Sequence, residues 1–246
     1  MVLSRAPFLP FLTVALVWHG AAWSAHSPLL PSPLAVLDCL WQDATHGPLL
    51  HHLLATLRRA GLGFVLALGV GGGVGVMMGH SARLDRWLDP WLQTLLTLPA
   101  LVVAILCYIW LGLGENAALL AIVLTKLPSM AVILRQGSRQ RDRDLRDMAR
   151  IFRFTPWQRL IHLTLPELAP FLLAATRSGL ALVWKIVLLI ELLGRPDGIG
   201  FQLNIYFQLL DLRHVLAYAL SFMAVMVLFD QTLMRWMDHH VARWQR

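Results

Sequence analysis

The sequence predicts an all-α fold, a bundle of about six helices that crosses a membrane. Hydrophobic residues make up 57% of its 246 residues and charged residues only 14%, whereas soluble domains carry about 25% charged residues. The mean hydropathy is +0.62. The apolar residues also gather in runs of about 20, the length that crosses a hydrocarbon core of about 30 Å. Because five or six such spans use up the whole length, we expect a single transmembrane domain over residues 1–246.

Hydropathy predicts six spans, at about 8–25, 60–79, 91–112, 116–135, 169–193 and 214–236. Prolines and glycines inside them are tolerated, because neighbouring helices satisfy the freed backbone groups. The first span has an alternative reading as a secretory signal, since Arg5 precedes an apolar run that ends at Trp23, Ser24 and Ala25. Trp23 stands where cleavage needs a small residue, which favours a retained span.

The distribution of the 21 basic residues predicts the orientation. With the N-terminus inside, fourteen basic residues fall on the cytoplasmic side, four fall outside and three lie within spans. An excess of lysine and arginine marks cytoplasmic loops, so both termini are expected in the cytoplasm. The net charge of +7 then reflects topology and lipid contact, and a nucleic-acid partner is not expected.

Residues 1–50 are expected to hold the first span and an external segment, and residues 51–236 the core of the domain. The external segment, residues 26–59, contains amphipathic stretches at 34–41 and 49–57, which favour a position at the membrane interface. Two readings stay open for this segment. It is either a connecting loop or a docking surface for an external partner.

The second span is rich in glycine, with three pairs at GxxxG spacing. Such a helix lets another backbone approach closely. The spacing does not choose between packing within one subunit and a seam between two copies. The candidate packing residues are Gly69, Gly71, Gly73, Gly75 and Gly79.

A charged segment, residues 141–170, interrupts the apolar pattern and overlaps a predicted loop at 136–168. Its residues predict a short helix that begins near Asp142 or Asp144 and is interrupted by Pro156. Apolar side chains such as Ile151 and Phe152 are unusual in a purely solvated loop. The segment is therefore a candidate surface for a cytoplasmic partner.

The same segment resembles the cytoplasmic coupling loop of ABC-importer permeases, an E/D-A-A-x-x-x-G core followed by a Leu-Pro pair. Arg153 takes the place of the glycine and Met148 that of the first alanine. The resemblance implies that an ATPase subunit docks here. The residues carried over are Asp147, Met148, Ala149, Arg150, Phe152, Arg153, Leu165 and Pro166.

Further motifs extend the resemblance over residues 50–235. They include residues 55–58, the Leu-Pro-Ala of 98–100 and the WLGLGE of 110–115. Their order is similar to that of the nitrate/sulfonate/taurine-type permeases of binding-protein-dependent importers. The resemblance implies a type I importer permease fold in the bacterial inner membrane. It also implies a homodimer with two ATPase subunits inside and a solute-binding protein outside.

Charges inside spans are the candidates for a translocation path, because each costs about 2.5–3.5 kcal/mol to insert. On the fifth span Arg177, Trp184 and Glu191 recur every seven residues and form one stripe. Lys185 lies beside this stripe, and Lys126 lies in the fourth span. The excess of cations favours an anionic solute. Structural ion pairs and snorkelling side chains are the alternative reading.

The sequence lacks the common motifs of nucleotide-binding and catalytic sites. It contains no phosphate-binding G-x-x-x-x-G-K-[ST] loop, no H-E-x-x-H and no G-x-S-x-G. No enzymatic activity or cofactor is therefore expected, although an intramembrane enzyme and a channel or scaffold subunit stay open as alternatives. No metal site is expected either, because adjacent histidines at 51–52 and 239–240 point about 100° apart. With only Cys39 and Cys107 present, an internal disulfide is not expected.

Overall fold

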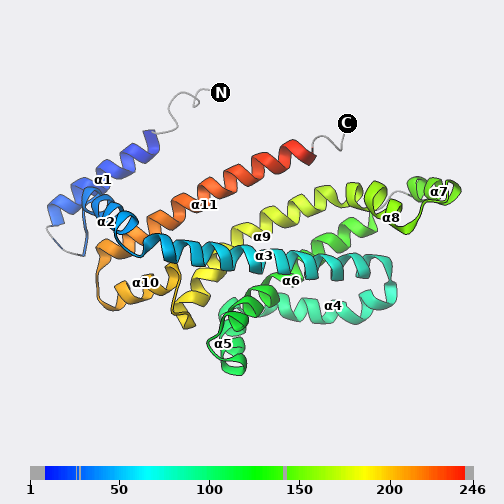
Figure 1. Ribbon diagram of the computed structural model, residues 1–246, viewed down its shortest axis with the longest axis horizontal. Helices are drawn as coiled ribbons and strands as arrows, with labels where there is room; N and C mark the ends of the chain where they lie inside the picture. The colour runs from blue at the N-terminus through cyan, green and yellow to red at the C-terminus, as the bar shows by residue number, and fades with distance from the viewer. Residues whose placement is uncertain (1–8, 26, 28, 141–142, 242–246) are drawn as a thin grey trace.

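The computed structural model describes residues 9–25, 27, 29–140 and 143–241, and it confirms an all-α fold, with no β-strand among these residues (Figure 1). Four of the described helices have 25 residues or more, namely α3, α6, α9 and α11, and α6 packs against both α3 and α9. The helices are α1 (Leu9–Ala25), α2 (Pro33–Thr45), α3 (Leu49–His80), α4 (Ala82–Thr97), α5 (Ala100–Leu111), α6 (Glu115–Arg139), α7 (Arg143–Ile151), α8 (Pro156–Arg159), the π-helix η1 (Leu160–Thr164), α9 (Leu165–Gly194), α10 (Ile199–Gln208) and α11 (Leu212–Val241).

Four helical stretches are long and apolar enough to cross a membrane: α3, α6, the continuous run Trp157–Gly194, and Leu212–Leu233 within α11. The bent pair α4 and α5 makes a fifth crossing if the two helices form one span. Helix α1 has 17 described residues, at the lower limit of the length that crosses a bilayer. Length and composition thus support four or five of the six predicted spans among the described residues.

The predicted span at 91–112 is broken in the structure. The chain bends there by 101° between α4 and α5. Leu98 and Pro99 adopt extended conformations at the bend, and for Leu98 this agrees with the preference of a residue before proline for extended backbone. Pro99 is then the N-cap residue of α5.

The predicted external segment is only partly separate from the bundle. Its first amphipathic stretch forms α2, which Ser32 caps by accepting a hydrogen bond from the Ala35 N–H (3.3 Å). Its second stretch, 49–57, is the first part of α3 and continues into the span without a break. Arg58 and Arg59 therefore lie on a spanning helix and not in a loop.

The glycines of α3 divide between two faces. Gly71, Gly75 and Gly79 face α6, and a Cβ atom at Gly71 would lie 2.6 Å from the Leu127 carbonyl oxygen. At Gly75 an added Cβ would overlap the backbone carbonyl of Ala131. Gly69 and Gly73 instead have open space around them. Three of the five candidate packing glycines thus pack within the subunit, and the other two do not.

Candidate functional site

The coupling segment lies at one end of the molecule, where α7 and α8 extend beyond the long helices (Figure 1). Its short helices carry large apolar side chains in the open. Ile151 is 77% exposed, Phe152 69% and Trp157 68%. Exposed apolar side chains gathered on one surface are typical of an interaction site. This end of the molecule is therefore a candidate docking surface.

The turn after α7 has the geometry of a Schellman motif. The Phe154 N–H donates to the Ala149 carbonyl oxygen (2.9 Å), and Arg153 between them has a φ of 51°. This left-handed position after a helix is usually glycine. The glycine that the family pattern places at position 153 therefore has a structural explanation, and Arg153 adopts the same backbone conformation at a cost.

A capping box begins α8. The Thr155 N–H donates to Gln158 Oε1 (2.8 Å), and the Gln158 N–H donates to Thr155 Oγ1 (3.3 Å). Pro156 occupies the first helical position, where its missing N–H costs nothing. From here α8, η1 and α9 form one continuous helical run. Leu165 and Pro166 therefore lie within an unbroken helical run and do not turn the chain.

The predicted coupling residues fall into two groups. Residues 147–153 lie on α7 and its turn, whereas Leu165 and Pro166 lie at the start of α9. Ala149 is only 1% exposed, so its side chain supports the turn and does not contribute to the exposed surface. Asp147, Met148, Phe152, Arg153 and Leu165 are exposed, Pro166 is half-buried, and the Arg150 side chain lies outside the described part of the chain.

The five predicted path residues do not form one continuous surface. Arg177 and Lys185 lie on the exposed side of α9, whereas Trp184 and Glu191 face the core. Lys126 of α6 is 6% exposed, and it forms none of the ion pairs found among the described residues. The cations of α9 are thus separated from the acidic end of the predicted stripe.

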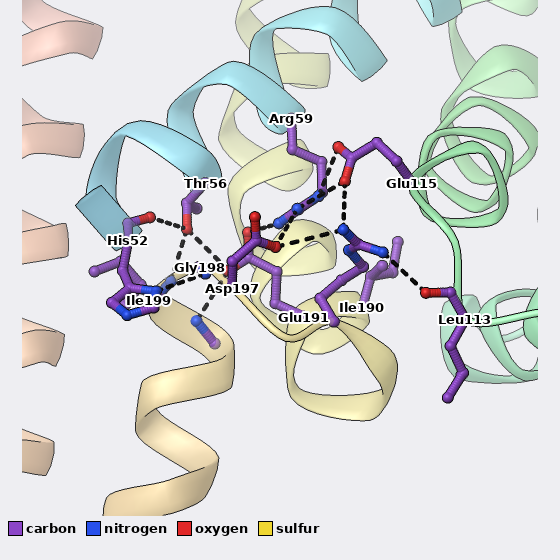
Figure 2. A network of polar contacts seen from close by, with 12 residues as sticks. His52, Thr56, Arg59, Leu113, Glu115, Ile190, Glu191, Asp197, Gly198 and Ile199 are labelled. Atoms are coloured by element: carbon purple, nitrogen blue, oxygen red, sulfur yellow. Dashed lines mark hydrogen bonds and ion pairs between the residues drawn. The ribbon is translucent and has the colours of Figure 1, made fainter. Parts of the chain in front are cut away.

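Glu191 belongs to a buried polar network (Figure 2). At its centre is Arg59 of α3, whose side chain is fully buried. Its guanidinium pairs with Glu191 of α9, with Glu115 at the start of α6 (3.0 and 2.9 Å) and with Asp197 after α9 (2.8 Å). Removing one partner of such a buried pair typically costs about 3–5 kcal/mol. The network therefore ties three helices together.

The turn between α9 and α10 closes onto Glu191. The carboxylate accepts hydrogen bonds from the Thr56 hydroxyl and from the Gly200 N–H, both at 2.9 Å. Gly198 has a φ of 108°, and a Cβ there would overlap the Glu191 carboxyl group. Only glycine has this conformational freedom without a side chain, so position 198 cannot accept another residue without moving Glu191.

A second arginine completes the network at its exposed edge. Arg195 pairs with Glu115 (3.0 Å) and donates to the Leu113 carbonyl oxygen (2.9 Å). Burial by itself would raise the pKa of Asp197, but the hydrogen bond and charge of Arg59 outweigh it and hold the pKa below its usual value. Asp197 is therefore ionised at neutral pH and stays paired.

Sequence reasoning missed this network, because it placed Arg59 among external loop residues. The partners of Arg59 lie 56, 132 and 138 positions away in the chain. One signal was available: Arg59, Glu115 and Glu191 each stand near an end of an apolar segment. Opposite charges at span ends indicate candidates for pairing, although they do not say which of them meet.

Long apolar helices, a projecting amphipathic segment and charges held inside the bundle are typical of a class, the membrane-spanning subunits of transporters. The chain belongs to one family of that class, described as the inner membrane component of binding-protein-dependent transport systems, whose model matches residues 67–245. It is thus a multi-pass inner-membrane permease subunit of an ABC importer. In an ABC importer a separate subunit hydrolyses ATP, and members of this family work with a binding protein.

Relatives agree with this membership. A Bacillus subtilis protein named as an aliphatic sulfonates transport permease is 29% identical over 96% of this chain and 86% of its own length. A riboflavin transport system permease of Chloroflexus aurantiacus is 32% identical over 88% of this chain and 81% of its own. The first confirms the resemblance to sulfonate-type permeases.

The fold also matches a solved structure. A chain of the MetNI methionine ABC transporter, in an inward-facing conformation, superposes with a TM-score of 0.67 at 17% identity. The match covers 83% of this chain and 99% of that chain. This confirms the predicted type I importer permease fold.

Proposed function

We propose that two copies of this chain form the translocation path for a small anionic solute, of the sulfonate, taurine or nitrate kind. The observation that carries this proposal is the exposed side of α9, which bears Arg177 and Lys185. The two acidic residues of α9 lie elsewhere, since Glu191 is buried and Glu167 is in the first turn. A path lined by this side of α9 would present cations near the middle of the membrane, where an anion otherwise has its highest energy.

The coupling segment is the proposed contact with the ATPase subunits. Exposed Ile151, Phe152 and Trp157 supply the apolar surface that a cleft on a partner needs. Since α8, η1 and α9 form one continuous run, movement at α8 would be passed directly to α9. A binding protein would deliver the solute at the opposite end.

The proposed orientation places both termini and the coupling segment in the cytoplasm. Helices α7 and α8 lie together at one end of the molecule (Figure 1), which supports placing both on the same side of the membrane. The segment with eight arginines, 135–159, then faces the cytoplasm as the positive-inside rule requires.

Uptake measurements in the reconstituted importer test the solute class. Replacing Arg177 and Lys185 together by glutamine should lower uptake of taurine or nitrate at least tenfold while the complex still assembles. Replacing Arg83 and Arg86, which lie on α4, removes the same charge and should leave uptake within about twofold. The proposal fails if the α9 double variant transports the anion normally, or if the wild-type importer carries riboflavin and no anion.

A further inference from the structure

We propose that Cys39, Asp43 and His214 bind a divalent transition-metal ion of the zinc class, which fastens α2 to the start of α11. One ligand atom of each residue lies within 4.8 Å of the others. Ligands at about 2.0–2.3 Å from a tetrahedral zinc ion stand about 3.5 Å apart. The three ligand atoms would therefore have to draw closer by about 1 Å to hold one ion.

Two packed helices supply the three residues. Cys39 and Asp43 stand four positions apart on α2, so they share one face of that helix. His214 lies in the first turn of α11, which packs against α2. Cys39 is 3% exposed, and Asp43 and His214 are half-buried. The cluster is thus enclosed between two elements that a shared ion would join.

The imidazole of His214 is already oriented as a metal ligand would be. Its Nδ1 lies 2.6 Å from Asp211 Oδ2, and its ring stacks on Tyr206 with centroids 4.5 Å apart. Histidines that bind metals almost always give their other ring N–H to a carboxylate, which fixes the tautomer. With Nδ1 held by Asp211, Nε2 is the nitrogen left for an ion.

Two buried polar atoms beside the cluster are poorly satisfied. Among the described residues, neither Asp43 Oδ2 nor the Tyr218 hydroxyl makes a hydrogen bond of ordinary geometry, and both atoms are buried. Tyr218 is 0% exposed, packs against Tyr206 (5.3 Å between centroids) and interacts with Asp43. A cation would satisfy the carboxylate directly.

The charges around Cys39 also favour a cation. Three carboxylates, those of Asp38, Asp43 and Asp211, surround the cluster, and the nearby Arg213 is held by Asp38 (2.7 Å) and by a backbone carbonyl oxygen. Burial and then the charge of Asp43 raise the pKa of the Cys39 thiol. A bound metal ion would instead favour the thiolate form of Cys39, and the thiol proton would be released to solvent as the sulfur–metal bond forms.

The mixed donor set indicates which metals fit. Thiolate, imidazole and carboxylate together suit zinc and its neighbours, whereas magnesium and calcium take oxygen ligands. Three protein ligands leave one coordination position for water or the Tyr218 hydroxyl. Zinc is therefore the ion that this site is expected to hold, and cobalt(II) is a suitable spectroscopic probe.

Cobalt(II) titration of the detergent-purified importer complex tests the site. Wild type should bind one ion per chain with thiolate-to-cobalt charge-transfer absorption, which zinc displaces. Cys39→Ser should remove that absorption. The matched control Cys107→Ser, which deletes the other buried cysteine, should keep it. Asp211→Asn, which removes the group that orients His214, should weaken binding about 10- to 100-fold.

A second measurement, of thermal stability, keeps the test decisive if one variant fails to fold. Zinc should raise the melting temperature of wild type, and His214→Gln, which keeps the thiol, should lose that rise while its melting temperature without zinc stays near that of wild type. The proposal is overturned if wild type shows neither the absorption nor the zinc-dependent rise, or if Cys39→Ser or His214→Gln behaves as wild type does.

Discussion

At the scale of single residues, the turn after α7 carries a measurable strain. Arg153 occupies a left-handed conformation, which costs an L-residue with a Cβ atom about 1–2 kcal/mol. Leu210 does the same after α10, and the hydrogen bonds around it, from the Asp211 N–H to the Tyr206 carbonyl oxygen (2.9 Å) and from the Leu210 N–H to the Phe207 carbonyl oxygen (3.1 Å), form the same motif. The chain thus uses the Schellman turn twice without the glycine that favours it.

Arg153→Gly should relieve the strain and stabilise the coupling segment by about 1 kcal/mol. Amide hydrogen exchange measures this, and the Phe154 amide, which donates across the turn, should exchange about fivefold more slowly. Arg153→Ala is the control, since it removes the guanidinium but keeps the Cβ. Equal protection in the two variants would show that the backbone conformation of residue 153 is not the cause.

At the scale of elements, the α7–α8 pair has the features of a docking surface on a rigid support. Helix α7 is charged along its length, yet Ile151 and Phe152 at its end are exposed. A change at Ala149 is a poor test of docking, because the side chain is buried and a charge there would disrupt the turn itself. The exposed phenylalanine separates docking from folding.

Phe152→Asp should weaken binding of the ATPase subunit at least about 30-fold, since a buried aromatic anchor at an interface is typically worth 2 kcal/mol or more. Co-purification of the ATPase and ATP-driven uptake measure the effect. Leu209→Asp is the matched control, because Leu209 is 68% exposed on the α10–α11 turn and should keep the ATPase bound. If Phe152→Asp assembles and transports normally, the coupling role of α7 is wrong.

At the scale of the whole molecule, α9 connects the coupling segment with the Arg59 network. Its 30 residues extend about 45 Å at 1.5 Å per residue. The network fixes its far end to α3 and α6 through Glu191. A helix held at one end and exposed to a partner at the other can transmit movement across the bilayer. The side of the membrane on which the α7 end of this helix lies then decides whether it can contact a cytoplasmic ATPase.

Topology reporters test that direction. A cytoplasm-active reporter fused after Gln140, between α6 and α7, should be active, and one fused after Gly47, in the turn between α2 and α3, should be inactive. The reason is the concentration of arginines around the coupling segment. The reverse pattern would place α7 outside and remove any contact with a cytoplasmic ATPase.

Most of the membrane architecture could be predicted from the sequence, because hydropathy acts on each segment separately. The spans of α3, α6, α9 and α11 follow from local composition. The bend at Pro99 could not be predicted, since prolines are tolerated within spanning helices when neighbours satisfy the backbone. Pro128 and Pro170 do lie inside unbroken helices of this chain.

The sequence by itself determined the membrane class, the resemblance to permeases and the position of the coupling segment, all of which depend on residues that are close together in the chain. Only the tertiary structure decided that Arg59 is a buried partner of Glu191 and that Cys39, Asp43 and His214 converge. The physical reason is the distance along the chain over which each process acts. Helix formation and membrane insertion are decided within about 20 residues, whereas an ion pair or a metal site requires distant side chains to approach within a few ångströms, and that approach depends on how the helices pack.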